Sequence, residues 1–164
     1  MVRYKCRYIL CKVIFTGNRK TCKINENDIY TKVKNEIGAL HGDYALAALR
    51  NVPSFGVRYI DGNTGVVLIR CQRDLLKIVQ SAITYVKKIN TEDAFLQTIH
   101  VGGTIRSCLK FLIRYHRSRL PQLLMECKTE DEKKKVQAAI VESCKTSTRV
   151  MCTWERREKS DTPR

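Results

Sequence analysis

Apolar positions at strand and helix spacing predict a run of elements from the amino terminus. Residues 3–15 alternate cationic and apolar side chains and then become apolar on both faces, which predicts a central strand with an exposed, basic beginning. Asn25 is placed to cap a helix that Gly42 ends. Short strand candidates follow at 44–50 and 55–60.

The pattern continues through a second helix to a last strand. A turn at 61–63 separates the 55–60 segment from a strong strand at 65–71, so a hairpin is expected there. Apolar residues across 75–86 predict a helix with a broad buried face, and 98–101 predict the closing strand.

The order strand, helix, strand, strand, helix, strand is the split βαβ pattern of ferredoxin-like and RNA-recognition folds. The predicted fold class is therefore α+β, a ferredoxin-like sandwich with two additional C-terminal helices at about 104–120 and 129–145. With 164 residues, of which 43% are apolar, the chain suits one compact domain over 1–145. Residues 146–164 are polar and unpatterned, which predicts a disordered tail.

The predicted helix after Thr104 has two separate stripes. Its apolar stripe consists of Ile105, Cys108, Leu109, Leu112 and Ile113. Arg106, Lys110, Arg114 and Arg117 form a basic stripe roughly 135° away at about 100° per residue. No acid lies between Thr104 and Arg119, and the preceding Gly102-Gly103 turn opens backbone N–H groups to an anion. This pattern indicates a phosphate-binding surface; the alternative is a basic face kept for solubility.

The positive charge is concentrated along the chain. The formal net charge is +15, and residues 1–23 and 104–119 carry seven and five cations with no acid. Such clustering favours a polyanionic partner, and nucleic acid is favoured over a membrane because the basic stretches lack a wide, tryptophan-rich apolar face.

Eight cysteines are scattered without any Cys-x-x-Cys pair, which argues against a zinc site and suits reduced thiols in an intracellular protein. No membrane-spanning segment is expected. We therefore expect the protein to hold no metal or cofactor of its own.

An enzyme is the rival hypothesis. A metal-independent ribonuclease needs paired acid and base groups. Only three histidines exist, and each has a structural explanation: His41 closes a helix before Gly42, His100 lies in a short strand, and His116 falls on or beside the apolar stripe of its helix. The aspartates occur singly, mostly at helix starts and turns, where capping explains them. No catalytic residue is therefore predicted.

Base reading by aromatic side chains of the sheet is also not favoured. The strand at 65–71, which corresponds to the first RNA-recognition signature, contains no aromatic residue. Tyr4 and Tyr8 on the first strand suit core or rim packing at least as well as stacking. Contact with RNA backbone and shape fits the composition better.

The sequence also resembles a known family from its first residue to about Leu120. The blocks that carry the resemblance are MVRYKCRY at 1–8, HG at 41–42, VRY at 57–59, TG at 64–65, LIRC at 68–71 and HVGGTIR at 100–106. They are similar, in the same order, to the Pop-five family of small basic subunits of ribonuclease P and ribonuclease MRP. The resemblance implies a ferredoxin-like, non-catalytic protein of an RNA-based endonuclease that removes the 5′ leader of precursor tRNA, with a further role in rRNA processing.

The family also implies partners and a location. These are ribonuclease P/MRP RNA, precursor tRNA and a TIM-barrel-like subunit of roughly thirty kilodaltons, in the nucleus and nucleolus, with Mg²⁺ bound by the RNA. A generic structured-RNA-binding or ribosome-associated protein is the alternative.

We expect the phosphate contacts to come from the first strand, the hairpin, the Gly-Gly turn and the basic helix. The predicted residues are Arg3, Lys5, Arg7, Arg58, Arg70, Gly102, Gly103, Thr104, Arg106, Lys110 and Arg114. Arg58 and Arg70 sit in predicted strands, where pairing with acids is an equally good explanation.

Overall fold

The structure is a computed structural model that describes residues 5–16, 24–50, 55–62, 64–90, 92–126 and 130–160. The chain divides into two compact units, 1–104 and 105–164. We call them the sheet unit and the helical unit and describe each by itself. This division differs from the single domain expected over 1–145.

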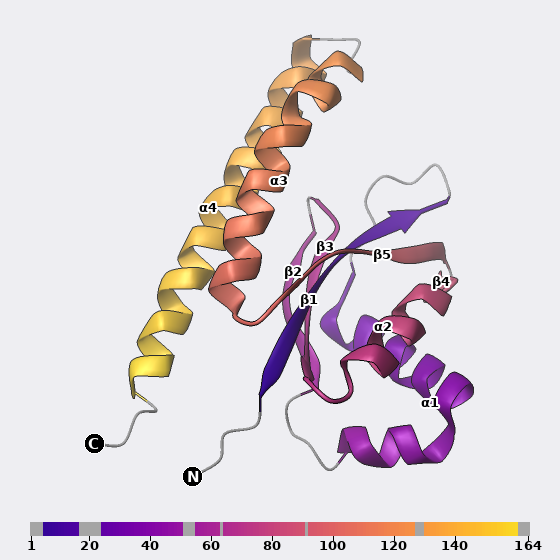
Figure 1. The fold of residues 1–164 in the computed structure, drawn as a ribbon. Coiled ribbons are helices and arrows are strands. Elements are labelled where there is room, and N and C mark those ends of the chain that lie inside the picture. The colour runs from indigo at the N-terminus through magenta and orange to yellow at the C-terminus, as the bar shows by residue number, and fades with distance from the viewer. Residues whose placement is uncertain are drawn as a thin grey trace. The chain divides into compact units, whose positions relative to one another are not determined.

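The sheet unit has the predicted ferredoxin-like order with one extra short strand (Figure 1). Its elements are β1 (Cys6–Phe15), α1 (Glu26–Arg50), β2 (Gly56–Asp61), β3 (Val66–Gln72), α2 (Leu76–Tyr85), β4 (Lys88–Ile89) and β5 (Glu92–Gly102). The strands follow the order β2-β3-β1-β5-β4, and all neighbouring pairs are antiparallel. Because β3 lies between β1 and β2, the split βαβ arrangement and the central position of β1 are confirmed.

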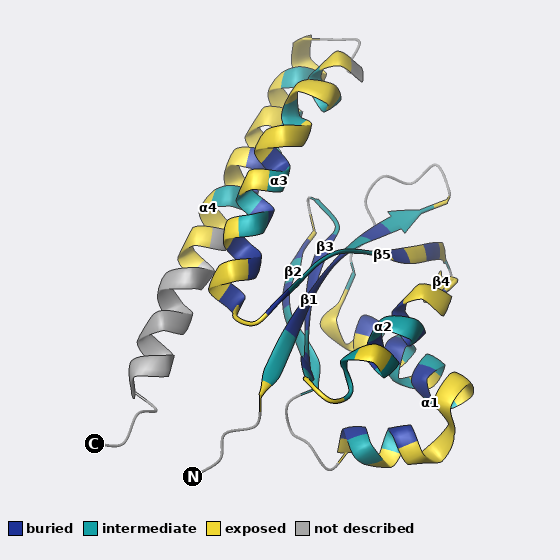
Figure 2. Ribbon diagram, in the orientation of Figure 1, coloured by how far each residue is buried: buried dark blue, intermediate teal, exposed yellow. Residues whose placement is uncertain are grey.

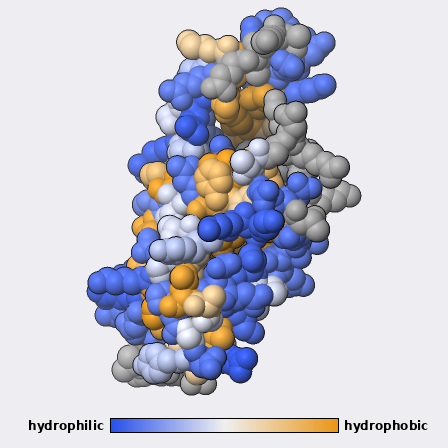
Figure 3. Space-filling model, turned by 90° about the vertical axis from the view of Figure 1, so that its right-hand side faces the viewer, coloured by the Kyte–Doolittle hydropathy of each residue, from blue (hydrophilic) through white to orange (hydrophobic). Residues whose placement is uncertain are grey.

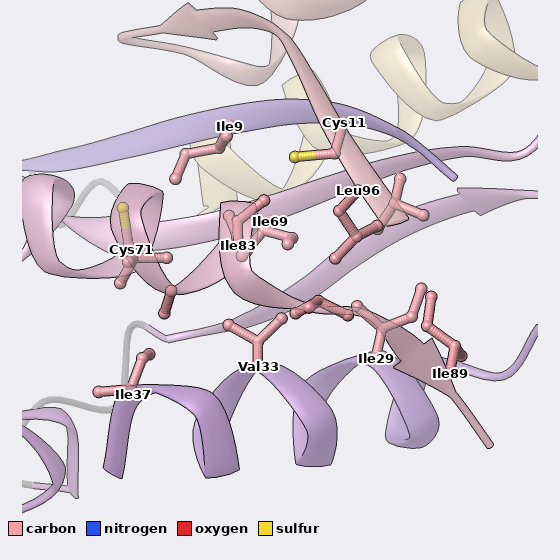
Figure 4. Packing of buried hydrophobic residues seen from close by; sticks show 14 of the residues in the cluster. Ile9, Cys11, Ile29, Val33, Ile37, Ile69, Cys71, Ile83, Ile89 and Leu96 are labelled. Atoms are coloured by element: carbon pink, nitrogen blue, oxygen red, sulfur yellow. The ribbon is translucent and has the colours of Figure 1, made fainter. Parts of the chain in front are cut away.

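The core of this unit lies between one face of the sheet and the helices α1 and α2 (Figure 4). Ile9 and Cys11 of β1 and Ile69 of β3 enter it from the sheet, while Val33 and Ile83 enter it from the helices. All five side chains are buried. Residues on the opposite face of β1 and β3 are buried as well, as Leu10 and Leu68 illustrate, so β1 is apolar on both faces as predicted.

Helix α1 confirms one prediction and corrects another. Gly42 has φ 72° and ψ −170°, which are not helical values, so the first helical segment ends at this kink as predicted and a second one follows it. The strand predicted at 44–50 is wrong, because this segment is the second half of the helix. This segment is helical because Ala45 and Leu49, which are one helical turn apart, both pack into the core.

The strands differ from prediction mainly at their ends. β2 and β3 form the expected hairpin, with Val57 opposite Ile69. β5 has 11 residues, whereas only 98–101 were expected, and β4 was not predicted. β4 pairs with the beginning of β5 over two residue pairs, and such a short pairing leaves no periodic pattern in the sequence.

The helical unit consists of α3 (Ile105–Glu126) and α4 (Glu130–Ser160), which pack against each other. α3 contains Pro121 within the helix and extends beyond the predicted end at about 120. α4 extends through 146–160, where a disordered tail was expected. The disordered tail was predicted because this segment lacks apolar periodicity. The segment also contains neither glycine nor proline, so nothing in its sequence ends the helix. None of the described helices is long and apolar enough to span a membrane.

Candidate nucleic-acid interface

Four of the predicted site residues, Arg7, Arg70, Gly102 and Gly103, lie at the end of the sheet where β1 begins. In the sheet, Tyr8 pairs with Arg70 of β3 on one side and with Gly102 of β5 on the other. This register places Arg70 and the Gly-Gly turn at the same end of the central strand. A Cβ atom built on Gly103 would lie 3.7 Å from Nη1 of Arg7, so that guanidinium lies directly beside the turn.

Hydrogen bonds hold both arginines at this end. Arg7 Nη1 donates to the backbone oxygen of Cys6 at 3.1 Å, and Arg70 Nη2 lies 3.3 Å from Cys6 Sγ. Both arginines are half-buried and Lys5 is exposed. Among the described residues, neither arginine forms an ion pair with a carboxylate. The alternative explanation of Arg70, that it pairs with an acid, therefore finds no support in this part of the chain. We call Lys5, Arg7 and Arg70 the strand cluster.

Other predicted residues of the sheet unit are less closely connected. Arg58 is half-buried at a register shift of β2, between Val57 and Tyr59. Thr104 is exposed and immediately precedes α3, as expected of a capping position. Arg3 lies outside the described residues.

The two stripes predicted on α3 are confirmed by burial (Figure 2). Ile105, Cys108, Leu109 and Leu112 are buried, and Ile113 is half-buried. Arg106, Lys110, Arg114 and Arg117 are all exposed. The first turn of the helix contains no acid. The basic stripe is therefore an exposed cationic surface about three turns long.

An aromatic feature of α3 was missed at the sequence level. The rings of Phe111 and Tyr115 lie 6.4 Å apart between centroids at an interplanar angle of 20°. One turn later, Arg119 Cζ lies 5.5 Å from the centroid of Tyr115, and Arg119 Nη1 donates to Tyr115 Oη at 3.1 Å. We call these three residues the aromatic ladder. Their spacing of four residues is the signal that could have identified it.

The possible metal ligands and the histidines among the described residues belong to several different elements. No three potential metal ligands gather within the described part of the chain. The histidines lie in three different elements: His41 Nε2 lies 2.7 Å from Ser81 Oγ, His100 is half-buried in β5, and His116 is buried in α3.

Two cysteines of the sheet are inert at neutral pH. Burial raises the pKa of Cys11 from 9.0 to about 12 and does the same to the pKa of Cys71. Both are free thiols, and a protonated thiol is a poor nucleophile and a poor metal ligand. Their role is packing in the core.

The outer surface is largely hydrophilic where it is seen in Figure 3, with hydrophobic residues in separate patches. Tyr44 and Met125 are the most exposed of the large hydrophobic residues that the structure describes, at 84% and 85%. Tyr44 belongs to the sheet unit and Met125 to the helical unit, so neither unit contains both.

Comparison with known proteins identifies the family. The family model described as "Rpp14/Pop5 family" matches residues 7–113, which include Arg7 and Arg70 of the strand cluster and the first two residues of the basic stripe, Arg106 and Lys110. A "Ribonuclease P/MRP protein subunit POP5" from Bos taurus is 38% identical over 148 residues, covering 88% of this chain and 86% of that protein. The proteins of the same name from Homo sapiens and Danio rerio are each 36% identical over 148 residues, covering 88% of this chain and 90% and 87% of theirs. The chain therefore belongs to the Rpp14/Pop5 family.

Proposed function

We propose that this chain is a non-catalytic protein subunit of the ribonuclease P/MRP particle. Membership of the Rpp14/Pop5 family supports the assignment, because relatives over most of the chain carry that subunit's name. The observation that carries the proposed role is the exposed basic stripe of α3, which has no acid beside it in the helix's first turn. The chain would act in removal of the 5′ leader from precursor tRNA and in rRNA processing.

The proposed role is electrostatic. Lysine and arginine side chains neutralise phosphates and thereby hold two RNA segments together against their mutual repulsion. The strand cluster and the basic stripe each present three or more cations. Bond cleavage is left to Mg²⁺ bound by the RNA, which can activate the attacking water and stabilise the leaving oxygen.

The residues proposed for phosphate contact fall into two groups. In the sheet unit they are Arg3, Lys5, Arg7, Arg58, Arg70, Gly102, Gly103 and Thr104. In the helical unit they are Arg106, Lys110 and Arg114. The strand cluster is the best supported part of the first group, because its two arginines are held by hydrogen bonds at the end of the central strand.

The proposed partners are the ribonuclease P/MRP RNA, precursor tRNA and the TIM-barrel-like subunit of the particle. The proposed location is the nucleus and nucleolus. The protein itself is proposed to hold no cofactor, which agrees with the buried, protonated state of its two core thiols.

Recovery of bound RNA from cell extract tests the assignment. The tagged full chain is compared with two variants, one with Arg106, Lys110 and Arg114 changed to glutamine and one with Arg50, Lys77 and Lys87 changed in the same way. The control residues are equally exposed and equally charged but lie on α1, α2 and the segment before β4. We expect ribonuclease P or MRP RNA with the wild type and the control, and much less with the first variant. Ribosomal RNA alone would favour a generic ribosome-associated protein.

A cleavage assay tests the non-catalytic role separately. Purified chain freed of RNA should bind precursor tRNA but leave it intact in the presence of Mg²⁺. Cleavage that disappears when one histidine or aspartate is replaced would show that the protein carries catalytic groups.

A further inference from the structure

The pairing of β1 with β3 continues one residue pair beyond Cys6 and Gln72. At this next step the backbone N–H of Arg73 donates to the carbonyl oxygen of Lys5 at 2.8 Å. Arg73 therefore lies directly opposite Lys5, at the same end of the central strand as the strand cluster. The sequence alone did not indicate Arg73, because its position depends on the register of the two strands.

Two backbone hydrogen bonds fix Arg73 at this position. Its N–H donates to Lys5, and its carbonyl oxygen accepts from the N–H of Leu76 at 3.3 Å, where α2 begins. Arg73 is nevertheless exposed, as Lys5 is. The backbone is thus held in place while the guanidinium extends into solvent.

Three cations at this end of the sheet start from one face. Successive residues of a strand point to opposite faces, so Lys5 and Arg7 share a face. Arg7 pairs with Cys71, and Arg73 is two residues further along, so Arg73 starts from that face as well. Because Cys71 belongs to the core, this is the face that α1 and α2 cover. Cations therefore continue this face at the end where its apolar residues stop.

Among the described residues, no carboxylate forms an ion pair with any of these three cations. Asp74 is the neighbour of Arg73 in the sequence, but its Oδ2 accepts a hydrogen bond from Gln72 Nε2 at 2.9 Å. The first turn of α2, which follows, contains no acid. Grouped cations without a paired acid suit a polyanionic ligand.

We propose that Arg73 is a further phosphate-binding residue, which together with Lys5 and Arg7 binds neighbouring phosphates of one RNA strand at the end of the sheet. The proposal rests on the proposed function, because Lys5 and Arg7 belong to the strand cluster. Adjacent strands are about 4.8 Å apart, and residues two apart in one strand are separated by about 6.7 Å. The three cations are thus spaced so that each can contact a phosphate of its own. Such contacts position the RNA without selecting its sequence.

The salt dependence of precursor tRNA binding to the full chain tests the proposal. Arg73→Gln removes the charge, and Arg73→Lys keeps it. Lys87→Gln is the matched control, because Lys87 is also exposed but lies between α2 and β4. Arg7→Gln is measured alone and together with Arg73→Gln. Thermal unfolding of each variant verifies that it is folded.

The slope of log K against log salt should fall by about 0.7 to 0.9 in Arg73→Gln and by about 1.5 in the double variant. It should stay close to the wild-type value in Arg73→Lys and in the control. A slope of Arg73→Gln equal to that of the control would overturn the proposal. A double variant with the same slope as Arg7→Gln alone would overturn it too, because Arg73 would then have no phosphate of its own. Failure of the proposed function would appear differently, as recovery of ribosomal RNA alone from extract with the wild type.

Discussion

Arg70 Nη2 of β3 lies 3.3 Å from Cys6 Sγ of β1, which joins two residues that are 64 positions apart in the sequence. This contact holds a guanidinium at the end of the central strand where Arg7 also lies. The two arginines form no ion pair with a carboxylate among the described residues. No described carboxylate therefore neutralises their charge.

Replacing Arg7 and Arg70 together with glutamine should weaken RNA binding. The slope of log K against log salt should fall by about 0.7 to 0.9 for each lost phosphate contact, hence by about 1.5 for both. Replacement of both by lysine keeps the charge and should keep most of the slope. Binding measured by filter retention over a range of salt concentrations checks this, with Lys77→Gln and Lys87→Gln together as a control of equal charge. A slope equal to that of the control would contradict the assignment of these arginines.

Leu112→Ala tests the opposite stripe of α3. Leu112 is fully buried, and removing its side chain should lower the free energy of unfolding by about 2 to 5 kcal/mol through lost burial and a residual cavity. The salt dependence of RNA binding by the remaining folded protein should not change. Urea unfolding gives the first quantity and RNA titration the second. A loss below about 1 kcal/mol would mean that this stripe is not packed as described.

Gly42→Ala tests the kink of α1. The backbone at Gly42 has a combination of φ and ψ that residues with a side chain rarely adopt, and it lies between the two helical halves that bury Ile37 and Ala45. We expect a loss of about 1 to 3 kcal/mol in unfolding free energy. Gly56→Ala is the matched control, since a Cβ there meets nothing within 4 Å and φ is not positive, so it should cost little. Equal stability of the two variants would argue against the kink.

The buried thiols predict a pH dependence of stability at alkaline pH. Burial raises the pKa of Cys11 to about 12 from 9.0, so the folded state favours the protonated thiol. This contribution is complete below pH 9.0 and is lost as the pH rises toward 12, by about 1.4 kcal/mol per pH unit for each such thiol. Because other groups titrate in this range, the wild type is compared with Cys11→Ala by urea unfolding between about pH 8 and pH 11. The variant should show the shallower decline, and parallel curves would be evidence against burial of this thiol.

The sequence predicted α3 well because its two stripes repeat at helical spacing without interruption from Ile105 to Arg117. It failed at 44–50, where a strand was predicted but a second helical segment follows the kink at Gly42. It also missed β4, because a strand of two residues is too short to produce a recognisable pattern in the sequence. Propensity and periodicity are local, so they fail where neighbouring elements decide the structure.

The grouping of site residues shows the same limit. The sequence indicated Arg7, Arg70 and Gly103 as candidates but could not place them at one end of the sheet, because that placement depends on the register of β1 with β3 and β5. In this register Arg70 pairs with Tyr8 and Arg7 with Cys71, so the two arginines lie at the same end of the central strand but start from opposite faces of the sheet. The aromatic ladder, by contrast, lies within one helix and was visible in the spacing of Phe111, Tyr115 and Arg119.

The central claim is that the basic stripe of α3 binds RNA phosphates, and the salt dependence of binding tests it most directly. Arg106, Lys110 and Arg114 are changed together to glutamine, with Arg50, Lys77 and Lys87 changed together as a control of equal charge. The slope of log K against log salt should fall by about 2 in the stripe variant and by much less in the control. Thermal stability should change little, since surface substitutions usually cost within about 0.5 kcal/mol. An unaltered slope in a folded stripe variant would show that this face is merely solvated and would leave the strand cluster as the main RNA contact.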